Sequence, residues 1–409
     1  MKLKALLFSL LLTATAVAQN CGDRFYQEVF TNVNSTTVNY GQNTTNGGTN
    51  QTLSMDIYQP VGDTFQYRPL LIWVHGGSFL GGSKNDPDVQ ELSQAFAKRG
   101  YVTASINYRL GISLPLNRDN TIRAVIRAVH DLKAAIRYFR QDFYTNGNVY
   151  KIDPEQIFIG GSSAGAITAL HTAYLDNYPE FQNVADSTII INLGGVEGNS
   201  GNPGYSSKVK GVVNLCGGIG KANWQTPNDP PGIHMHGTAD NTVPYATNQV
   251  RVSGIPITGL FIDGSYVVDS FAQTIGLSSH LYTWNGAGHV PYVSSAAEMT
   301  VTKDFVTTHL APLVDCSRLF QDLTSAEVAY ISNNLRFYPN PANETLYLNL
   351  AADKSVSVQL MDLTGRTLKT WEIRSGESPV FSISDLASGV YVAKFQSGNQ
   401  IWQQKLIKE

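Results

Sequence analysis

The stretch QIFIGGSSAGAITAL, residues 156–170, predicts a strand, a tight turn and a helix in direct succession. It opens with apolar residues, passes through glycines and serines, and closes on small helix formers. Glycine and serine at such a corner suit two different structures: a helix packed closely on a sheet, or a strained turn that exposes a serine hydroxyl. The rest of the chain decides between them.

Length and composition limit what this chain can be. With 409 residues, 42% hydrophobic and 15% charged, it can bury a large core, and its length favours one large domain plus a smaller one. The formal net charge is -3 and no long run of either sign occurs, so we expect no nucleic-acid binding. No cysteine and histidine cluster has the spacing of a zinc site, so we expect no metal.

The N-terminal sequence predicts export. Residues 1–18 carry two lysines, then an apolar stretch, then the small residues Ala16-Val17-Ala18, which is the organisation of a secretory signal peptide. The apolar stretch is too short for a membrane anchor, and no other stretch is long enough to span a bilayer. We therefore expect a protein that leaves the cytoplasm and has no stable membrane span.

Strands and helices alternate through the first three quarters of the chain. The apolar runs PLLIWVHGG and GYVTASINY are typical of strands covered on both faces, and residues 119–140 have apolar side chains three or four positions apart. We expect further strands at QIFIG, VKGVVNLC, GIHMHG and HLYTWNG, an exposed loop over 41–52, and a last helix over about 296–310. This alternation predicts an α/β fold with a mainly parallel sheet flanked by helices.

The sequence pattern changes near residue 315. Residues 317–336 read as a polar connector, and beyond them LYLNL, VSVQLMDL, VFSIS and GVYVAKF are short alternating strands separated by turn residues. We therefore expect a large α/β domain over 19–316 and a small all-β sandwich over 337–409.

The three cysteines allow one disulfide. Cys21 and Cys316 lie at the two ends of the larger domain, and the ends of a domain often lie close together, so they are candidates for a bridge in an oxidising compartment. Cys216 ends an apolar run and is expected to be a buried, inert thiol.

Two glycine-rich elements are candidates for chemistry. Ser163 is the central residue of the G-x-S-x-G pattern in residues 161–165, between a predicted strand and a predicted helix, whereas Ser162 has the wrong register and is expected to be a spacer. Upstream, HGGSF at residues 75–79 follows another strand, and its N–H groups could stabilise an oxyanion, the alternative being a glycine turn with an incidental histidine. Both elements end strands on the same side of a parallel sheet.

A serine nucleophile needs a base, and the base needs an orienting carboxylate. His289 follows the strand HLYTW in the loop NGAGH, and Asp240 follows the strand GIHMHG. Asp263 in LFIDGS is a rival for the acid, although Asp-Gly there fits a turn equally well. Surface, packing or interior roles are expected for the other histidines considered, His130, His234, His236 and His309.

Ser163, Asp240 and His289, in that order, together with HGGSFLGG, INYRLG and GGSSAGA, resemble the α/β-hydrolase family and its carboxylesterase branch over about residues 50–312. The resemblance implies Ser163 as nucleophile, His289 as general base and acid, and Asp240 as the group that orients it. It implies no cofactor.

The same resemblance implies the oxyanion donors. They would be the backbone N–H groups of Gly77, Ser78 and Ala164, and Ser78 stands where many members of the family have a third glycine. Phe79 and Trp224 are candidate substrate-binding residues, the alternative being ordinary loop aromatics.

The C-terminal region has a resemblance of its own. FYPNPANETL, MDLTGR, LASGVYVAKF and the terminal QKLIK resemble the C-terminal sorting domain of the type IX secretion system of Bacteroidetes. This implies export through the periplasm of a Gram-negative bacterium to the medium or the cell surface, with the secretion machinery as a partner.

The sequence thus predicts a secreted serine carboxylesterase that works through an acyl-enzyme. Its expected substrates are esters of extracellular polymers or their fragments, such as acetyl or feruloyl esters of polysaccharides, or polyesters. A secreted serine peptidase of the same fold and a non-catalytic adhesion protein are the alternatives.

Overall fold

The computed structural model describes residues 21–175, 187–252 and 254–319 and, in the C-terminal region, residues 337–338, 340–348, 356–362, 366–374, 380–397 and 400–409. The predicted signal peptide and most of the predicted connector lie outside these ranges. No helix in the described ranges is both long enough and apolar enough to cross a membrane.

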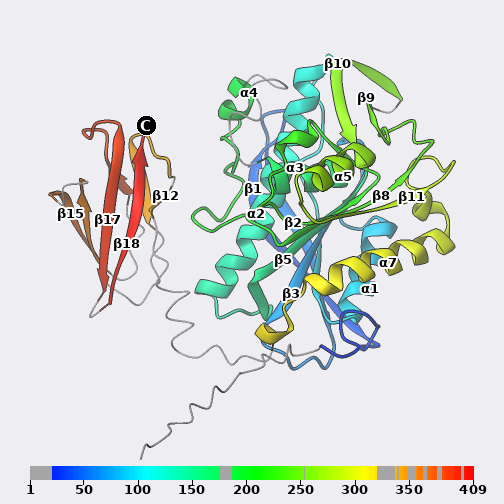
Figure 1. Ribbon diagram of the computed structural model, residues 1–409, viewed down its shortest axis with the longest axis horizontal. Helices are drawn as coiled ribbons and strands as arrows, with labels where there is room; N and C mark the ends of the chain where they lie inside the picture. Colours follow the sequence, from blue (N-terminus) through cyan, green and yellow to red (C-terminus); the bar gives the residue numbers. More distant parts are fainter. Residues whose placement is uncertain are drawn as a thin grey trace, which may run out of the picture.

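A mainly parallel sheet forms the centre of the larger body, as the sequence predicted (Figure 1). In the described ranges its order is β1-β2-β4-β3-β5-β6-β8-β11, with β1 and β2 antiparallel to their neighbours and all pairs from β4 to β11 parallel. The strands are β1 Val33–Thr44, β2 Asn50–Pro60, β3 Arg68–Val74, β4 Val102–Ile106, β5 Ile152–Ser162, β6 Gly211–Leu215, β8 Gly232–Gly237 and β11 Ser279–Trp284.

One prediction at this sheet was wrong. Residues 41–52 were expected to be an exposed loop, but they are the end of β1, a short turn and the start of β2. The asparagine, threonine and glycine content suits the turn, while the flanking residues pair across an antiparallel hairpin at the edge of the sheet, where polar side chains face solvent.

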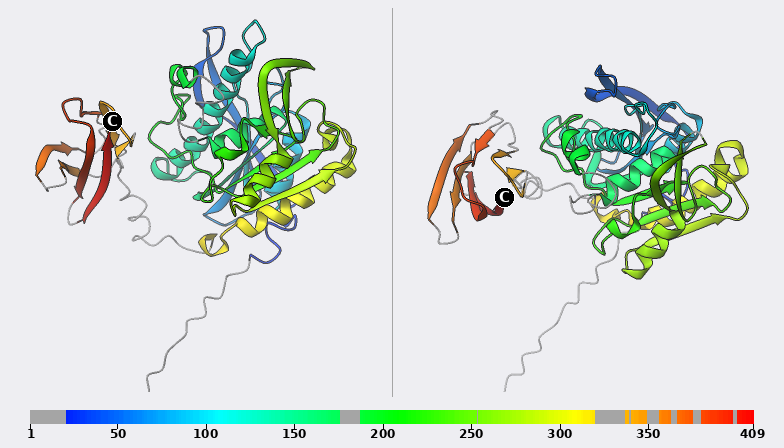
Figure 2. Two further views of the ribbon diagram at one scale, coloured as in Figure 1. Left: turned by 45° about the horizontal axis from the view of Figure 1, so that its top comes forward. Right: turned by 90° about the horizontal axis from the view of Figure 1, so that it is seen from above.

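Helices cover both faces of the sheet (Figure 2). Within β3 the side chains alternate: Leu70 and Ile72 pack in a core shared with α2, α3 and α5, whereas Leu71 and Trp73 pack in a second core shared with α1 and α7. The helices are α1 Pro87–Lys98, α2 Arg118–Thr145, α3 Ala164–Tyr174, α4 Ser187–Asn192, α5 Ser265–Thr274, α6 Pro291–Ser294 and α7 Ala296–Leu310, with short 3-10 turns at Ala222–Trp224, Ala311–Leu313 and Cys316–Leu319.

A hairpin that the sequence analysis did not predict stands outside this sheet. Strands β9 (Thr247–Val252) and β10 (Ile255–Gly264) pair antiparallel, and β10 also pairs with the two-residue strand β7 (Gly218–Ile219). The hairpin lies between Asp240 and His289 in the sequence, so it is positioned to border a site that contains them.

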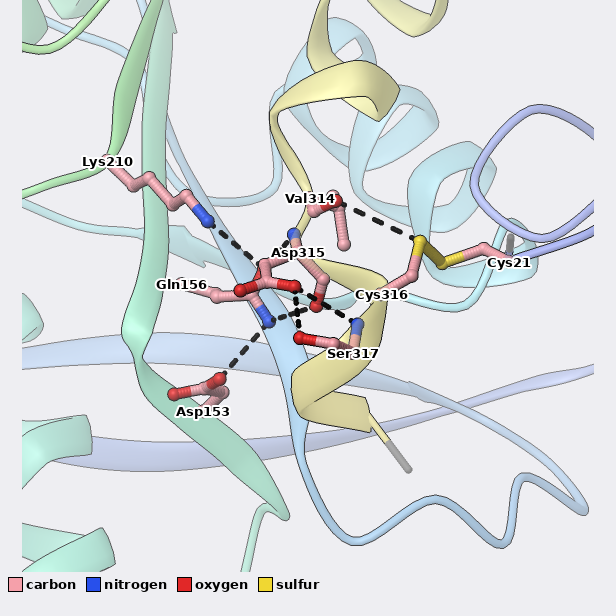
Figure 3. The surroundings of a disulfide bond; sticks show 8 residues. All are labelled: Cys21, Asp153, Gln156, Lys210, Val314, Asp315, Cys316 and Ser317. Carbon is pink, nitrogen blue, oxygen red and sulfur yellow. Dashed lines mark hydrogen bonds between the residues drawn. A yellow bond between two sulfur atoms is a disulfide. The ribbon is translucent and has the colours of Figure 1, made fainter. Parts of the chain in front are cut away.

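The two ends of the larger body are joined by a disulfide between Cys21 and Cys316, whose Cα atoms are 5.5 Å apart (Figure 3). Beside it, the Asp315 backbone N–H donates to Gln156 Oε1 on β5 at 2.6 Å. Leu319 is buried in the core shared with α1 and α7, so packing continues three residues past residue 316. The free thiol of Cys216 is buried, as expected.

The C-terminal region contains two antiparallel sheets. One has the order β12-β13-β16 and the other β15-β14-β17-β18, and both contribute to one apolar core. Phe337 of the first sheet contacts Trp371 and Phe395 of the second, with ring centroids 5.8 and 5.2 Å apart. The strands are β12 Phe337–Tyr338, β13 Thr345–Leu348, β14 Val356–Met361, β15 Thr367–Ile373, β16 Val380–Ser382, β17 Gly389–Ser397 and β18 Gln400–Lys408. The prediction of an all-β module agrees with this architecture.

Candidate active site

Ser163 occupies a strained turn between β5 and α3. Its backbone has φ 54° and ψ -114°, a conformation that non-glycine residues rarely adopt. The neighbouring glycines are required by close packing: a Cβ on Gly161 would lie 2.2 Å from the carbonyl carbon of Gly165, and a Cβ on Gly165 would lie 2.0 Å from the Val74 oxygen. The glycines therefore serve close packing, and that packing holds the strained turn at Ser163, which has the geometry of a nucleophile elbow.

His289 and Asp240 complete a chain of hydrogen bonds that begins at Ser163. The Ser163 Oγ lies 2.7 Å from His289 Nε2, and His289 Nδ1 lies 2.6 Å from Asp240 Oδ2. The Asp240 side chain is fully buried, while that of His289 is 19% exposed. The structure therefore brings together all three residues that the sequence analysis selected, with His289 between Ser163 and Asp240.

The environment of Asp240 keeps it ionised. Burial opposes its charge, but hydrogen bonds from His236 and His289 and from the backbone N–H of Thr242 outweigh burial and hold the pKa of Asp240 well below its ordinary value. The N–H groups of Thr242 and Val243 both donate to Oδ1, at 2.8 and 3.0 Å, which leaves Oδ2 to face His289.

The His289 loop is fastened to the elbow through Ser162. The hydroxyls of Ser162 and Tyr292 are 2.7 Å apart and buried, and Tyr292 follows His289 by three residues. Val290, which directly follows His289, has φ 46°, a left-handed conformation that a β-branched residue rarely adopts. The prediction that Ser162 is a spacer was therefore wrong, because its hydroxyl ties the turn of Ser163 to the loop of His289.

The rival acid Asp263 belongs to the hairpin. It lies in β10, where Oδ1 accepts from the Thr247 hydroxyl at 2.6 Å and Oδ2 accepts from the Ala222 N–H at 2.9 Å. The alternative of an Asp-Gly turn is also wrong, since both residues are part of the strand. Its carboxylate cross-links the base of the hairpin.

The remaining histidines selected from the sequence lie away from the Ser163 hydroxyl. The His130 Nε2 is bonded to the Gly195 carbonyl at 2.6 Å inside α2, and His309 on α7 stacks on His280 with ring centroids 3.9 Å apart. His234 and His236 are buried in β8, as expected, but His236 also contacts Asp240, which the sequence analysis missed.

The loop after β3 lies directly against Ser163. Gly77, Ser78 and Phe79 all have positive φ, at 104°, 56° and 61°, and a Cβ on Gly76 would lie 3.4 Å from the Ser163 Cβ. In the described part of the chain, the N–H groups of Gly77 and Ser78 donate to no protein group. Two unpaired donors beside Ser163 are suited to an oxyanion.

A residue that was not predicted supports this loop. The Tyr108 hydroxyl donates to the His75 and Gly76 carbonyls, both at 3.2 Å, and its ring stacks on the His75 imidazole with centroids 4.3 Å apart. Tyr108 belongs to INYRLG, which the sequence analysis used only for the family resemblance, and His75 is one of the loop's packing groups.

An apolar pocket opens beside Ser163. Phe79 and Trp224, the two candidate substrate-binding residues, both line it and are largely buried. Other walls come from α2, α3 and the β9–β10 hairpin, through Ile122, Val125, Ile126, Ile167, Val250, Val252, Leu260, Phe261 and Ile262. Within the ranges that the structure describes, no group of three histidine, cysteine or acidic side chains is arranged to hold a metal ion.

Two family models match the sequence. The model described as BD-FAE matches residues 55–220, and the one described as a secretion system C-terminal sorting domain matches residues 336–409. The first range contains Ser163 and the loop of Gly77 and Ser78, while Asp240 and His289 lie beyond its end.

Curated relatives include esterases and a lipase. Secreted lipase 5 of Gibberella zeae is 27% identical over 279 residues, 62% of this chain and 49% of that protein. Carboxylesterase 3B of Mus musculus is 33% identical over 116 residues, 28% of this chain and 19% of that protein. Para-nitrobenzyl esterase of Bacillus subtilis is 28% identical over 102 residues, which are 24% of this chain and 20% of that protein. The chain spans about half or less of the length of these relatives.

Among solved structures, esterase 2 of Thermogutta terrifontis is similar at 19% identity and a TM-score of 0.46, over 67% of this chain and 94% of the esterase. The family models describe the two regions separately. Residues 55–220 match the BD-FAE family and residues 336–409 match the secretion system C-terminal sorting domains, so the chain combines an α/β region similar to the first family with a C-terminal β region similar to the second.

Proposed function

We propose that this protein is a secreted carboxylic ester hydrolase that works through an acyl-enzyme. The observation that carries the proposal is the continuous hydrogen-bond chain from Ser163 through His289 to Asp240. The unpaired N–H groups of the adjacent loop support it, since an ester needs an oxyanion site opposite the nucleophile.

In this mechanism His289 Nε2 takes the proton of Ser163 while Oγ attacks the ester carbonyl carbon. The negative oxygen accepts hydrogen bonds from the N–H groups of Gly77, Ser78 and Ala164. Asp240 stabilises the imidazolium that forms. The imidazolium then gives its proton to the departing alcohol, and water, activated in the same way by His289, releases the acid.

The pocket supports a hydrophobic acyl group. Its walls are mostly aliphatic and aromatic side chains, so an aromatic acyl group such as feruloyl would bury apolar surface against them, whereas an acetyl group would leave most of them unfilled. We therefore favour feruloyl esters of polysaccharides over acetyl esters, with polyesters as a further polymeric class.

Export is part of the proposal. The signal peptide predicted over residues 1–18 would direct the chain to the periplasm, and the matched sorting domain supports onward transport by type IX secretion to the medium or the cell surface. The disulfide between Cys21 and Cys316 is consistent with an oxidising compartment.

The test is hydrolysis by the full-length protein and by Ser163→Ala of nitrophenyl acetate, nitrophenyl ferulate, an acylated xylan and a peptide. We expect ester hydrolysis that falls by about 1,000-fold or more in the variant. Ser93→Ala is the control, because Ser93 is a buried serine on α1 at the other face of the sheet. Ester turnover that survives in Ser163→Ala would refute the mechanism.

The other outcomes decide between the alternatives. Peptide turnover without ester turnover would favour a serine peptidase of the same fold. Binding to the polymer with no turnover of any substrate would favour an adhesion protein. Faster turnover of nitrophenyl acetate than of nitrophenyl ferulate, two esters with the same leaving group, would contradict the acyl preference while leaving the esterase proposal intact.

A further inference from the structure

Asp240 contacts two histidines. His289 approaches Oδ2 from the solvent side at 2.6 Å, and His236, whose side chain is fully buried, approaches the same oxygen from the interior at 3.2 Å. His289 belongs to the loop after β11, whereas His236 belongs to β8 and precedes Asp240 by four residues. The second histidine has no part in the mechanism above, so its role must be found in its contacts.

The contacts of His236 determine where its hydrogen lies. Its Nε2 faces two acceptors, Asp240 Oδ2 at 3.2 Å and the Val243 carbonyl at 3.0 Å, so Nε2 carries a hydrogen and donates to both. Its Nδ1 lies 2.7 Å from the Ser265 hydroxyl. The ring is therefore held at both nitrogens, with its donor directed at the carboxylate.

A buried polar chain anchors this ring from behind. The Ser265 hydroxyl accepts from the Asn214 amide at 2.8 Å, and the same amide lies 3.0 Å from His234 Nδ1. His234, Asn214, Ser265 and His236 are all fully buried and come from β6, β8 and the start of α5. A connected network of this kind gives the ring one orientation.

The titratable groups around His236 are few. They are Asp240 in the following loop, His289 beyond that carboxylate, His234 two residues earlier on β8, and the Tyr245 ring, whose centroid lies 5.8 Å from that of His236. Burial opposes the charge of Asp240, and the hydrogen bond from His236 helps to keep the pKa of that carboxyl low.

We propose that His236 is a positioning residue for the function proposed above, on which this inference rests. Its Nε2–H holds the Asp240 carboxylate toward His289 and offsets part of the negative charge of that carboxylate. Without that donor the carboxylate would interact more strongly with His289, which would then keep its proton to higher pH. Loss of the donor would also free the carboxylate to rotate. Both effects reach the reaction only through Asp240.

Two substitutions separate the two sides of the ring. In His236→Gln the amide nitrogen can reach the place of Nε2 and still donate to Asp240, whereas in His236→Asn the shorter amide overlaps Nδ1, stays near Ser265 and leaves Asp240 without the donor. We expect kcat to fall about tenfold in His236→Asn, with KM little changed and the acid limb of kcat/KM displaced to higher pH. His236→Gln should retain most of kcat and the wild-type limb.

The control replaces another buried histidine, His130→Asn, whose Nε2 is hydrogen-bonded to the Gly195 carbonyl at 2.6 Å. We expect it to lower the melting temperature without moving the acid limb. Equal losses in folded His236→Asn and His236→Gln would overturn the proposal, because packing would then explain them. A wild-type profile in His236→Asn would overturn it as well.

Two further measurements test the role of His236 if His236→Asn does not fold or if the wild-type protein hydrolyses no ester. If His236→Asn does not fold, Ser265→Ala loosens the ring instead and should move the acid limb in the same direction by a smaller amount; an unchanged limb would refute the role. If the wild-type protein hydrolyses no ester, the proposed function fails, and NMR titration of the His289 ring still tests the contact. The ring should titrate at higher pH in His236→Asn than in the wild type, and equal titration would refute the role.

Discussion

Ser163 and the pair formed by Asp240 and His289 meet at one site, but different kinds of structure hold them. Ser163 is held by its own neighbours in sequence, through a strained turn and glycines that let β5, α3 and the end of β3 come into contact. Asp240 and His289 lie on two loops that reach the site from β8 and β11. The Asp240 loop is held by contacts with Thr242, Val243 and His236, all within four residues, whereas the His289 loop is tied through Tyr292 to Ser162, 130 residues earlier.

The difference concerns which changes each region tolerates. In the elbow, the space for a single methyl group is already occupied by backbone atoms. In the loops that carry Asp240 and His289, some residues have space beside them. The buried hydroxyl and imidazole groups that hold these loops would instead lose free energy if their hydrogen-bond partners were removed. The elbow should therefore be sensitive to volume and the loops to lost hydrogen bonds.

Gly165→Ala is expected to have the largest effect. The added Cβ would lie 2.0 Å from the Val74 oxygen and 2.6 Å from the His75 oxygen, so α3 would be forced away from the end of β3 and the loop that follows it. We expect little folded, active protein, as measured by soluble yield, circular dichroism and esterase activity. Gly288→Ala, beside His289, meets nothing within 4 Å and should fold normally. Equal tolerance at the two positions would remove the proposed difference between the regions.

Asp240→Asn should have the next largest effect. The neutral amide cannot stabilise the His289 imidazolium, so kcat should fall about 1,000- to 10,000-fold while the protein stays folded. The matched control is Asp263→Asn, which loosens the bonds to Thr247 and Ala222 and should reduce thermal stability while retaining most of kcat. Similar kcat losses in both variants would contradict the assignment of Asp240 as the acid.

Sequence reasoning found Ser163 because a contiguous pattern encodes its turn. It also found His289 and Asp240, since each follows a recognisable strand. It missed the roles of Ser162, Tyr292 and His236, because their partners lie between 4 and 130 residues away and nothing in the local pattern indicates a contact.

The β9–β10 hairpin was missed for a related reason. Its residues read as an irregular stretch, and its strands are defined by pairing with each other and with the two residues of β7. The sheet, by contrast, was predictable because strands covered on both faces are nearly continuous apolar runs. Pocket walls built by the hairpin, including Phe261 and Ile262, therefore had no sequence signal.

Removing the disulfide should lower the stability of the protein without changing the elbow at Ser163 or the loops of Asp240 and His289. Replacing Cys21 and Cys316 together with serine opens a loop with a sequence separation of 295 residues and should cost about 3–5 kcal/mol of unfolding free energy. Because neither cysteine contacts the site, kcat at low temperature should remain close to that of the wild type. Denaturant unfolding and kinetics on the same samples give both values, and a large fall in kcat would link the disulfide to the site.

Tyr292→Phe should have a smaller effect on stability than removal of the disulfide, and it tests the His289 loop directly. It removes one hydroxyl and leaves the buried Ser162 hydroxyl without that partner, so the His289 loop keeps its contact with Ser163 but loses the one with Ser162. We expect kcat to fall about tenfold, KM to change little, and stability to fall by about 1–2 kcal/mol.

Tyr174→Phe is the matched control. Its buried hydroxyl donates to the Pro230 carbonyl, with 3.1 Å between the two oxygens, and this hydrogen bond does not involve Ser163, His289 or Asp240. It should lose similar stability and keep kcat. In a double-mutant cycle, Ser162→Ala should add little to Tyr292→Phe, and fully additive losses of kcat would mean that this hydroxyl pair does not position the base.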